Sequence, residues 1–221
     1  MNIEVEHPKE DKSRLGGFSY IYGDICEREF SKVLEIEEQL ATQMDEQLQA
    51  ELEGKHFESG VKAILFAALS VEAAINDYAA WQLGDKYFDD HLSSLNVISK
   101  WVVIPKLVCG RSIDKSGPGF SSLRKLISAR NDLAHNKSRN FDLRDPDIYS
   151  KLEKRSKVFE NNVLNAYQCI VLLSLTMDQL VGPRFNPLKS FNKKVSLFLE
   201  IPKNAVPIVN NCRNIIAKNL S

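Results

Sequence analysis

The sequence predicts an all-α protein, an antiparallel helical bundle with a small C-terminal appendage. Three observations lead to this fold class. Long stretches without Gly or Pro carry apolar residues at three- and four-residue spacing, which is the period of an amphipathic helix. Gly and Pro gather between these stretches, where the chain must turn. With 221 residues, 43% of them hydrophobic, the chain is long enough to bury the core of one ordinary domain.

Three helices are expected in the first half of the chain. Residues 1–26 are polar and broken by glycines, so the first helix is placed at residues 27–53, which contain neither Gly nor Pro. Its apolar residues Val33, Ile36, Leu40, Met44 and Leu48 recur at three- and four-residue spacing, which indicates an amphipathic helix with an acidic outer face. Residues 61–83, which follow the break at Gly60, are rich in Ala and apolar nearly all round. That pattern indicates the central helix of the bundle. A short helix follows at residues 85–92.

Three further helices are expected in the second half. The first covers residues 94–108 and is interrupted at Pro105. The second covers residues 120–135, where Asn136 suits a C-terminal cap because Asn tolerates the left-handed conformation. The third is a long helix over residues 145–181 that carries the largest apolar stripe.

The chain is therefore divided into three parts. Residues 1–29 form an N-terminal arm, residues 30–182 the helical domain and residues 183–221 the C-terminal appendage. Apolar residues alternate over residues 195–201 of the appendage, which predicts a short strand, and a terminal helix follows.

The neutral net charge hides a division along the chain. Lys plus Arg and Asp plus Glu number 29 each, which argues against a protein that binds polyanions with its whole surface. Residues 1–60 nevertheless have a net charge of −9 and residues 61–94 of −3, whereas residues 95–144 have +7 and residues 145–221 have +5. Such asymmetry indicates either a nucleic-acid or acidic partner, or simply a solvated charged face.

The cysteines and the chain start indicate a cytoplasmic protein without a metal or other cofactor. The four cysteines are far apart and form no CxxC or Cys/His cluster, so we expect reduced thiols and no zinc site. The charged first residues lack the apolar core of a signal peptide. The longest uncharged stretch, residues 161–177, contains Asn and Gln, so no membrane span is expected.

Two polar residues interrupt the apolar helix expected at residues 61–83. Glu72 and Asn76 lie four residues apart and therefore on one face. A carboxylate or amide in a buried segment needs a hydrogen-bonding partner. The two side chains either bond a neighbouring helix or support a functional site.

The strongest candidate site lies at the end of the helix over residues 120–135, in the string RNDLAH from Arg130 to His135. The two residues lie about 140° apart on a regular helix, so they meet only at a frayed end or across a second surface. Arg neutralises phosphoryl oxygens and His transfers protons, a useful pair beside a phosphate. The alternatives are a structural helix end capped by His135 and Asn136, and a structural ion pair of Arg130 with Asp132.

This string, an Arg, a polar residue and a His after a short interval at the end of a helix, resembles the signature of the HEPN superfamily. Three upstream features fit the same pattern: Ser-x-Glu-x-x-x-Asn at residues 70–76, Lys100-Trp101, and Ile-Pro-Lys-Leu at residues 104–107. The resemblance covers residues 30–180. It implies a helical bundle that dimerises and places the Arg and His of both protomers in a cleft at the interface.

The resemblance further implies a metal-independent endoribonuclease. Arg130 would stabilise the charge on the phosphorus, His135 would act as general acid or base while the 2′-hydroxyl attacks, and Asn131 would orient either partner. Glu72 and Asn76 would fix these residues from the second layer. The products would be a 2′,3′-cyclic phosphate and a 5′-hydroxyl, which explains why DNA would be spared.

The partners expected are RNA, a second copy of the chain and a cognate antitoxin or regulatory protein, in stress response, toxin–antitoxin or antiviral defence. The basic segment would bind the RNA backbone, chiefly through Lys137, Arg139, Arg124 and Lys125. Two other readings stay open: a non-catalytic HEPN-like module that binds a nucleotide or a protein, and a helical protein of unrelated function.

Overall fold

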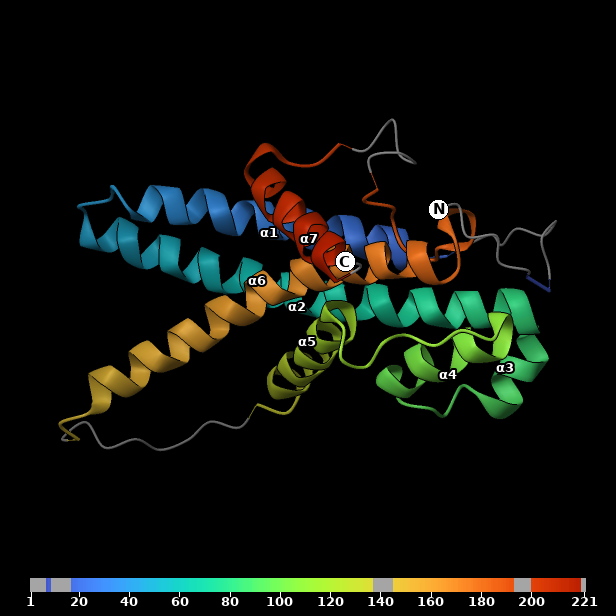
Figure 1. Cartoon of the computed structure of the whole chain (residues 1–221). Coiled ribbons are helices and arrows are strands. Elements are labelled where there is room, and N and C mark those ends of the chain that lie inside the picture. Colours follow the sequence, from blue (N-terminus) through green and yellow to red (C-terminus); the bar gives the residue numbers. More distant parts are fainter. Residues whose placement is uncertain (1–6, 9–16, 137–144, 193–199, 220–221) are drawn as a thin grey trace.

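Seven α-helices and no strand make up the part of the chain that this computed structural model describes, residues 7–8, 17–136, 145–192 and 200–219. The predicted all-α helical bundle is confirmed (Figure 1). The strand predicted over residues 195–201 lies mostly outside the described residues.

A hairpin of two long helices forms the spine of the bundle. Helix α1 spans Ser19–Leu40 and α2 spans Glu46–Leu83, and the two run antiparallel, side by side (Figure 1). The single helix predicted over residues 27–53 is therefore wrong: it breaks at residues 41–45. The break has a local cause, because the Asp45 carboxylate accepts hydrogen bonds from the backbone N–H groups of Gln47 and Leu48 and so caps a new helix.

Two glycines expected to break helices lie inside them instead. Gly23 is buried in α1, where an added Cβ would lie 3.3 Å from Ser70 Oγ of α2. Gly60 is buried in α2, where an added Cβ would lie 2.8 Å from both Phe159 Cζ and Val163 Cγ2 of the sixth helix. Both glycines serve close approach between helices rather than termination.

Three shorter helices cover the second half of α2. Helix α3 spans Asp85–His91, α4 spans Val97–Cys109 and α5 spans Pro118–Ala134. Gly110 ends α4 in the left-handed conformation, with φ 72°. The interruption predicted at Pro105 does not occur, since α4 continues through it.

The long helix α6, Ile148–Leu180, crosses the hairpin and continues beyond it. Its second half is buried in the core, whereas residues 149–158 are exposed and extend away from the body (Figure 1). Helix α7, Val206–Lys218, confirms the predicted terminal helix and packs against α6. Short 3-10 turns at Pro183–Phe185 and Lys203–Ala205 connect these elements.

The two predicted domain boundaries fall at different places relative to the helices. The boundary between residues 29 and 30 falls within α1, which begins at Ser19. The boundary between residues 182 and 183 coincides with the end of α6, where Gly182 has a φ of 85°. Cys212 of α7 is fully buried in the same core as α1 and α6.

Large aromatic side chains fix the helices around α2. Trp101 of α4 is fully buried, and its Nε1 donates a hydrogen bond of 3.2 Å to the Val71 carbonyl of α2. Tyr78 of α2 is also buried, and its hydroxyl lies 3.0 Å from Nε2 of His7, a residue that the sequence placed in a polar arm. The contact of Trp101 with Val71 holds α4 directly beside Glu72.

The glycine contacts predict opposite effects for two substitutions in α2. Gly60→Ala inserts a methyl group against Phe159 and the buried Val163, so we expect a loss of about 1–3 kcal/mol in the free energy of unfolding. Gly54→Ala meets nothing within 4 Å and should stabilise the protein by up to about 1 kcal/mol through helix propensity alone. Urea unfolding of both variants measures this, and stabilisation by Gly60→Ala would contradict the close approach of α2 and α6.

Candidate functional site

Helix α5 positions the candidate site through one stripe of its surface. Gly117 precedes the helix and Pro118 begins it, a residue suited to the first turn because its missing N–H needs no partner there. Ile127, Arg130 and Asn131 follow at the three- and four-residue spacing that puts side chains on one face. This face of α5 turns toward α2 and α4.

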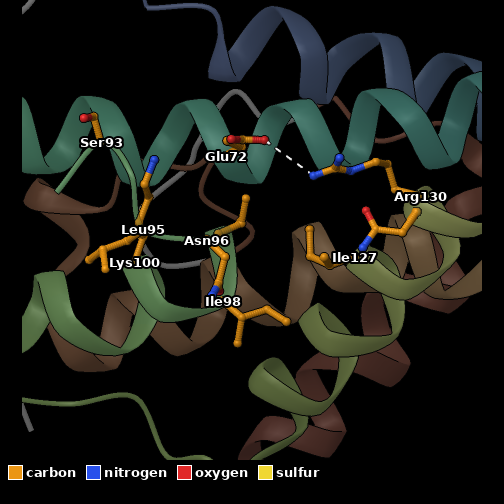
Figure 2. A pocket seen from close by; sticks show the side chains of 10 residues that line it. Glu72, Ser93, Leu95, Asn96, Ile98, Lys100, Ile127 and Arg130 are labelled. Carbon is orange, nitrogen blue, oxygen red and sulfur yellow. Dashed lines mark ion pairs between the residues drawn. The ribbon is translucent and has the colours of Figure 1, made fainter. Parts of the chain in front are cut away.

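A pocket of about 480 Å³ lies where these helices meet (Figure 2). Helix α2 contributes one carboxylate, the α3–α4 connection and α4 contribute polar and apolar side chains, and α5 contributes the stripe just described. The residues that line it are Glu72, Ser93, Leu95, Asn96, Val97, Ile98, Lys100, Ile127, Arg130 and Asn131. The volume lies within the range of small-molecule sites, roughly 300–1,000 Å³.

Arg130 is held loosely at this pocket. Its Nη2 lies 3.9 Å from Oε2 of Glu72, and the two side chains are 32% and 38% exposed, respectively. Figure 2 shows the guanidinium reaching from α5 toward Glu72 on α2. The ion pair with Asp132 proposed from the sequence is not the one that forms among the described residues. A pair this long and this exposed contributes little to stability and leaves the guanidinium available to a ligand.

Lys100 faces Glu72 from the opposite side of the pocket (Figure 2). The residue is only 3% exposed, and its Nζ donates a hydrogen bond of 3.0 Å to Oδ1 of Asn76 and lies 5.3 Å from the centre of the Phe88 ring. Burial lowers the pKa of Lys100, and the negative charge of Glu72 acts in the opposite direction. Asn76 thus hydrogen-bonds a residue of a neighbouring helix, whereas Glu72 reaches a neighbouring helix only through its long ion pair with Arg130.

His135 lies at the end of α5, outside the pocket lining. It is the C-cap residue, it is exposed, and its backbone N–H donates a hydrogen bond of 2.9 Å to the Asn131 carbonyl. The left-handed cap predicted at Asn136 is wrong, because no residue other than glycine has a positive φ in the described part of the chain. The structure therefore brings Arg130 and Asn131 together with Glu72, and leaves His135 one turn further along.

The predicted RNA-binding residues divide into two groups. Arg124 and Lys125 are exposed on α5, whereas Lys137 and Arg139 lie outside the described residues. At about 100° per residue, Arg124 lies within about 40° of Asn131 and His135 around the helix, so these three share a stripe. Lys125 lies about 100° from Arg124 around the helix and shares another exposed face with Asp132, seven residues further on.

Lys100 is the site residue that the sequence interpretation undervalued. It enters the predicted pattern only as part of the pair Lys100-Trp101, yet it lies in a segment, VISKWVV, that is otherwise almost wholly apolar. The reasoning applied to Glu72, that a charged residue in a buried segment needs a partner, finds Lys100 equally well. The polar pocket residues Ser93 and Asn96 carry no comparable pattern.

Comparisons with protein-family models, with curated proteins and with solved structures found no match to this chain. The resemblance to the HEPN superfamily thus stays a prediction. Within the described ranges, no helix is both long and apolar enough to cross a membrane. No three His, Cys, Asp or Glu side chains in those ranges cluster in a way that could hold a metal ion.

The environment of Lys100 predicts a specific pH dependence of stability. Because its pKa is lower in the folded chain than in the unfolded chain, the unfolded chain keeps the proton to a higher pH, and stability rises with pH between the two values. The free energy of unfolding should therefore increase more between pH 7 and about pH 10 in the wild type than in Lys100→Met. Denaturant titrations across this range measure the difference.

Lys86→Met is the control for this experiment. Lys86 is exposed on α3, so its removal should leave the pH dependence of the wild type intact. Parallel pH profiles for the wild type and Lys100→Met would contradict the burial of a charged Lys100 at this pocket.

Proposed function

We propose that this protein is a HEPN-type endoribonuclease that works as a homodimer, with Arg130 and His135 at its active site. The observation that carries the proposal is the accessible environment of these two side chains. Arg130 has one long ion pair and His135 is exposed at the end of the same helix. Both ionisable groups are therefore accessible to a substrate rather than used up in packing.

The chemistry follows from the two side chains. The five N–H donors of a guanidinium suit the non-bridging oxygens of a phosphodiester, whose charge grows as a fifth oxygen approaches phosphorus. The 2′-oxygen attacks and loses its proton, the bond to the 5′-oxygen breaks, and that oxygen gains a proton. His135 carries a proton in one of these transfers. The products are a 2′,3′-cyclic phosphate and a 5′-hydroxyl.

A second copy of the chain completes the proposed site. Arg130 faces the pocket on its own chain, whereas His135 lies about 140° further round the helix, so the two do not converge within one protomer. A two-fold axis beside the end of α5 would bring a second Arg and His to the same phosphate. Arg124, on the stripe of Asn131 and His135, would hold a neighbouring phosphate.

The second candidate function is a non-catalytic module that binds a nucleotide. The observation that favours it is the lining of the pocket, which includes Arg130, Asn131 and Lys100 but not His135. Such a module would need Arg130 and would be indifferent to His135.

Cleavage of RNA distinguishes the two functions. We expect the purified protein to cut a mixed-sequence RNA, and His135→Ala and Arg130→Ala to cut it at least about 100-fold more slowly, the lower end of the contribution of an acid–base group. Single-turnover assays with labelled RNA measure the rates. Products should carry a cyclic phosphate, and a 2′-deoxynucleotide at the cut site should block the reaction.

The matched controls are His91→Ala and Arg155→Ala, which remove an exposed His at the end of α3 and an exposed Arg of α6. Both should cut at the wild-type rate. Equal cleavage by wild type and His135→Ala would overturn the ribonuclease proposal.

A further inference from the structure

The pocket beside Arg130 has a feature that a phosphate site does not need. Glu72 lines it, and a carboxylate there repels a phosphate while it attracts groups that donate hydrogen bonds. The side chain of Glu72 accepts no hydrogen bond from the described residues, and its ion-pair partner Arg130 stands 3.9 Å away. Both carboxylate oxygens are thus open to a ligand that carries donors.

The remaining walls favour a flat, partly apolar ligand. Leu95, just before α4, and Ile127 of α5 border the pocket. The volume of about 480 Å³ leaves room for a small ring system. Figure 2 shows Glu72 above this space, with Lys100 on one side and Arg130 on the other. A nucleobase of single-stranded RNA has this character: apolar faces and an edge of donors and acceptors.

The donors and acceptors of the pocket select among the four bases. Only guanine presents two adjacent donors, N1–H and the 2-amino group, which match the two oxygens of one carboxylate. Adenine and cytosine each place a ring-nitrogen acceptor beside their amino group, and that lone pair would face the carboxylate. Uracil offers a single N–H between two carbonyl oxygens.

Lys100 completes the match. Guanine O6 is an acceptor that lies next to N1–H on the same edge, so its partner must be a donor beside the carboxylate. Lys100 lines the same pocket as Glu72, and its Nζ uses one of its three N–H donors on Asn76. With a base in the pocket, the ammonium and the carboxylate would together face the guanine edge.

We propose that this pocket binds a guanine base of RNA, through Glu72 and Lys100, while Arg130 at its edge binds the adjacent phosphate. The inference rests on the proposed ribonuclease function and names its substrate preference: the chain cuts RNA beside guanosine. Arg130 thereby links base recognition to the phosphate that reacts.

Equilibrium binding of the four nucleoside 5′-monophosphates to the full-length protein tests the pocket without any cleavage. We expect GMP to bind roughly tenfold or more tightly than AMP, CMP or UMP, because its discriminating hydrogen bonds go to a charged group. IMP, which lacks only the 2-amino group, should lose most of this advantage. This comparison uses the unaltered protein and so does not depend on the folding of a variant.

Glu72→Gln tests the assignment of the carboxylate. An amide presents one acceptor and one donor, which match the 6-amino group and N1 of adenine, so the preference should move from GMP toward AMP. Glu51→Gln, an exposed position of the same helix, should keep the preference for GMP. Mapping of the wild-type cut sites in a mixed-sequence RNA should show cleavage next to guanosines.

The outcomes separate the pocket from the ribonuclease proposal. Equal binding of the four nucleotides, with cleavage that ignores the base, overturns the guanine pocket and leaves the ribonuclease standing. A preference for GMP that depends on Glu72, without cleavage of any RNA, supports the pocket and overturns the ribonuclease. A preference for GMP that Glu72→Gln leaves unchanged also overturns the assignment made here.

Discussion

The candidate pocket depends on one carboxylate. Glu72 lies on a helix whose neighbouring turns are small and apolar, yet its side chain is 38% exposed at the pocket. Lys100 on α4 and Arg130 on α5 line the same pocket, and Trp101 fixes α4 beside α2 through the Val71 carbonyl. The pocket is the space that remains between these three charged side chains.

A second carboxylate, which is buried in the core, has a hydrogen-bond partner for each of its oxygens. Glu27 of α1 accepts hydrogen bonds of 2.8 Å from the Tyr167 hydroxyl and 2.9 Å from Lys189 Nζ. Burial and the charge of Glu27 raise the pKa of Tyr167, as expected when a phenol is locked beside a carboxylate. Glu27 therefore ties α1 to α6 and to the chain that follows it. Glu72, with no hydrogen bond in the described structure and one long ion pair, keeps its capacity to bind.

Much of the fold could be predicted from apolar spacing, and the errors have local causes. Residues 61–83 are correctly central because Ala-rich faces allow helices to pack closely on every side. The break at residues 41–45 was missed because it depends on Asp45, whose side chain caps α2 although the apolar spacing continues through it. Gly23 and Gly60 were misjudged because a glycine that ends a helix and a glycine that admits a neighbour are identical in sequence. For the site, Glu72 was predicted as a charge in an apolar helix and Arg130 as part of the string RNDLAH, but their pairing depends on how α2 and α5 pack.

The geometry of α5 connects the two proposed activities of the site. Ile127 and Arg130 turn toward the pocket, whereas Arg124 and His135 share a stripe about 120° to 140° round the helix from Arg130. Asn131 borders both. In the proposed complex, a base in the pocket would place its phosphate at Arg130, and the proton would come from an imidazole outside the pocket. On one chain His135 lies about 140° round the helix from Arg130, whereas in the proposed dimer a partner related by a two-fold axis would approach from the outer side. Base recognition within one protomer and proton transfer across the interface would then explain why Arg130 and His135 stand five residues apart on the same helix.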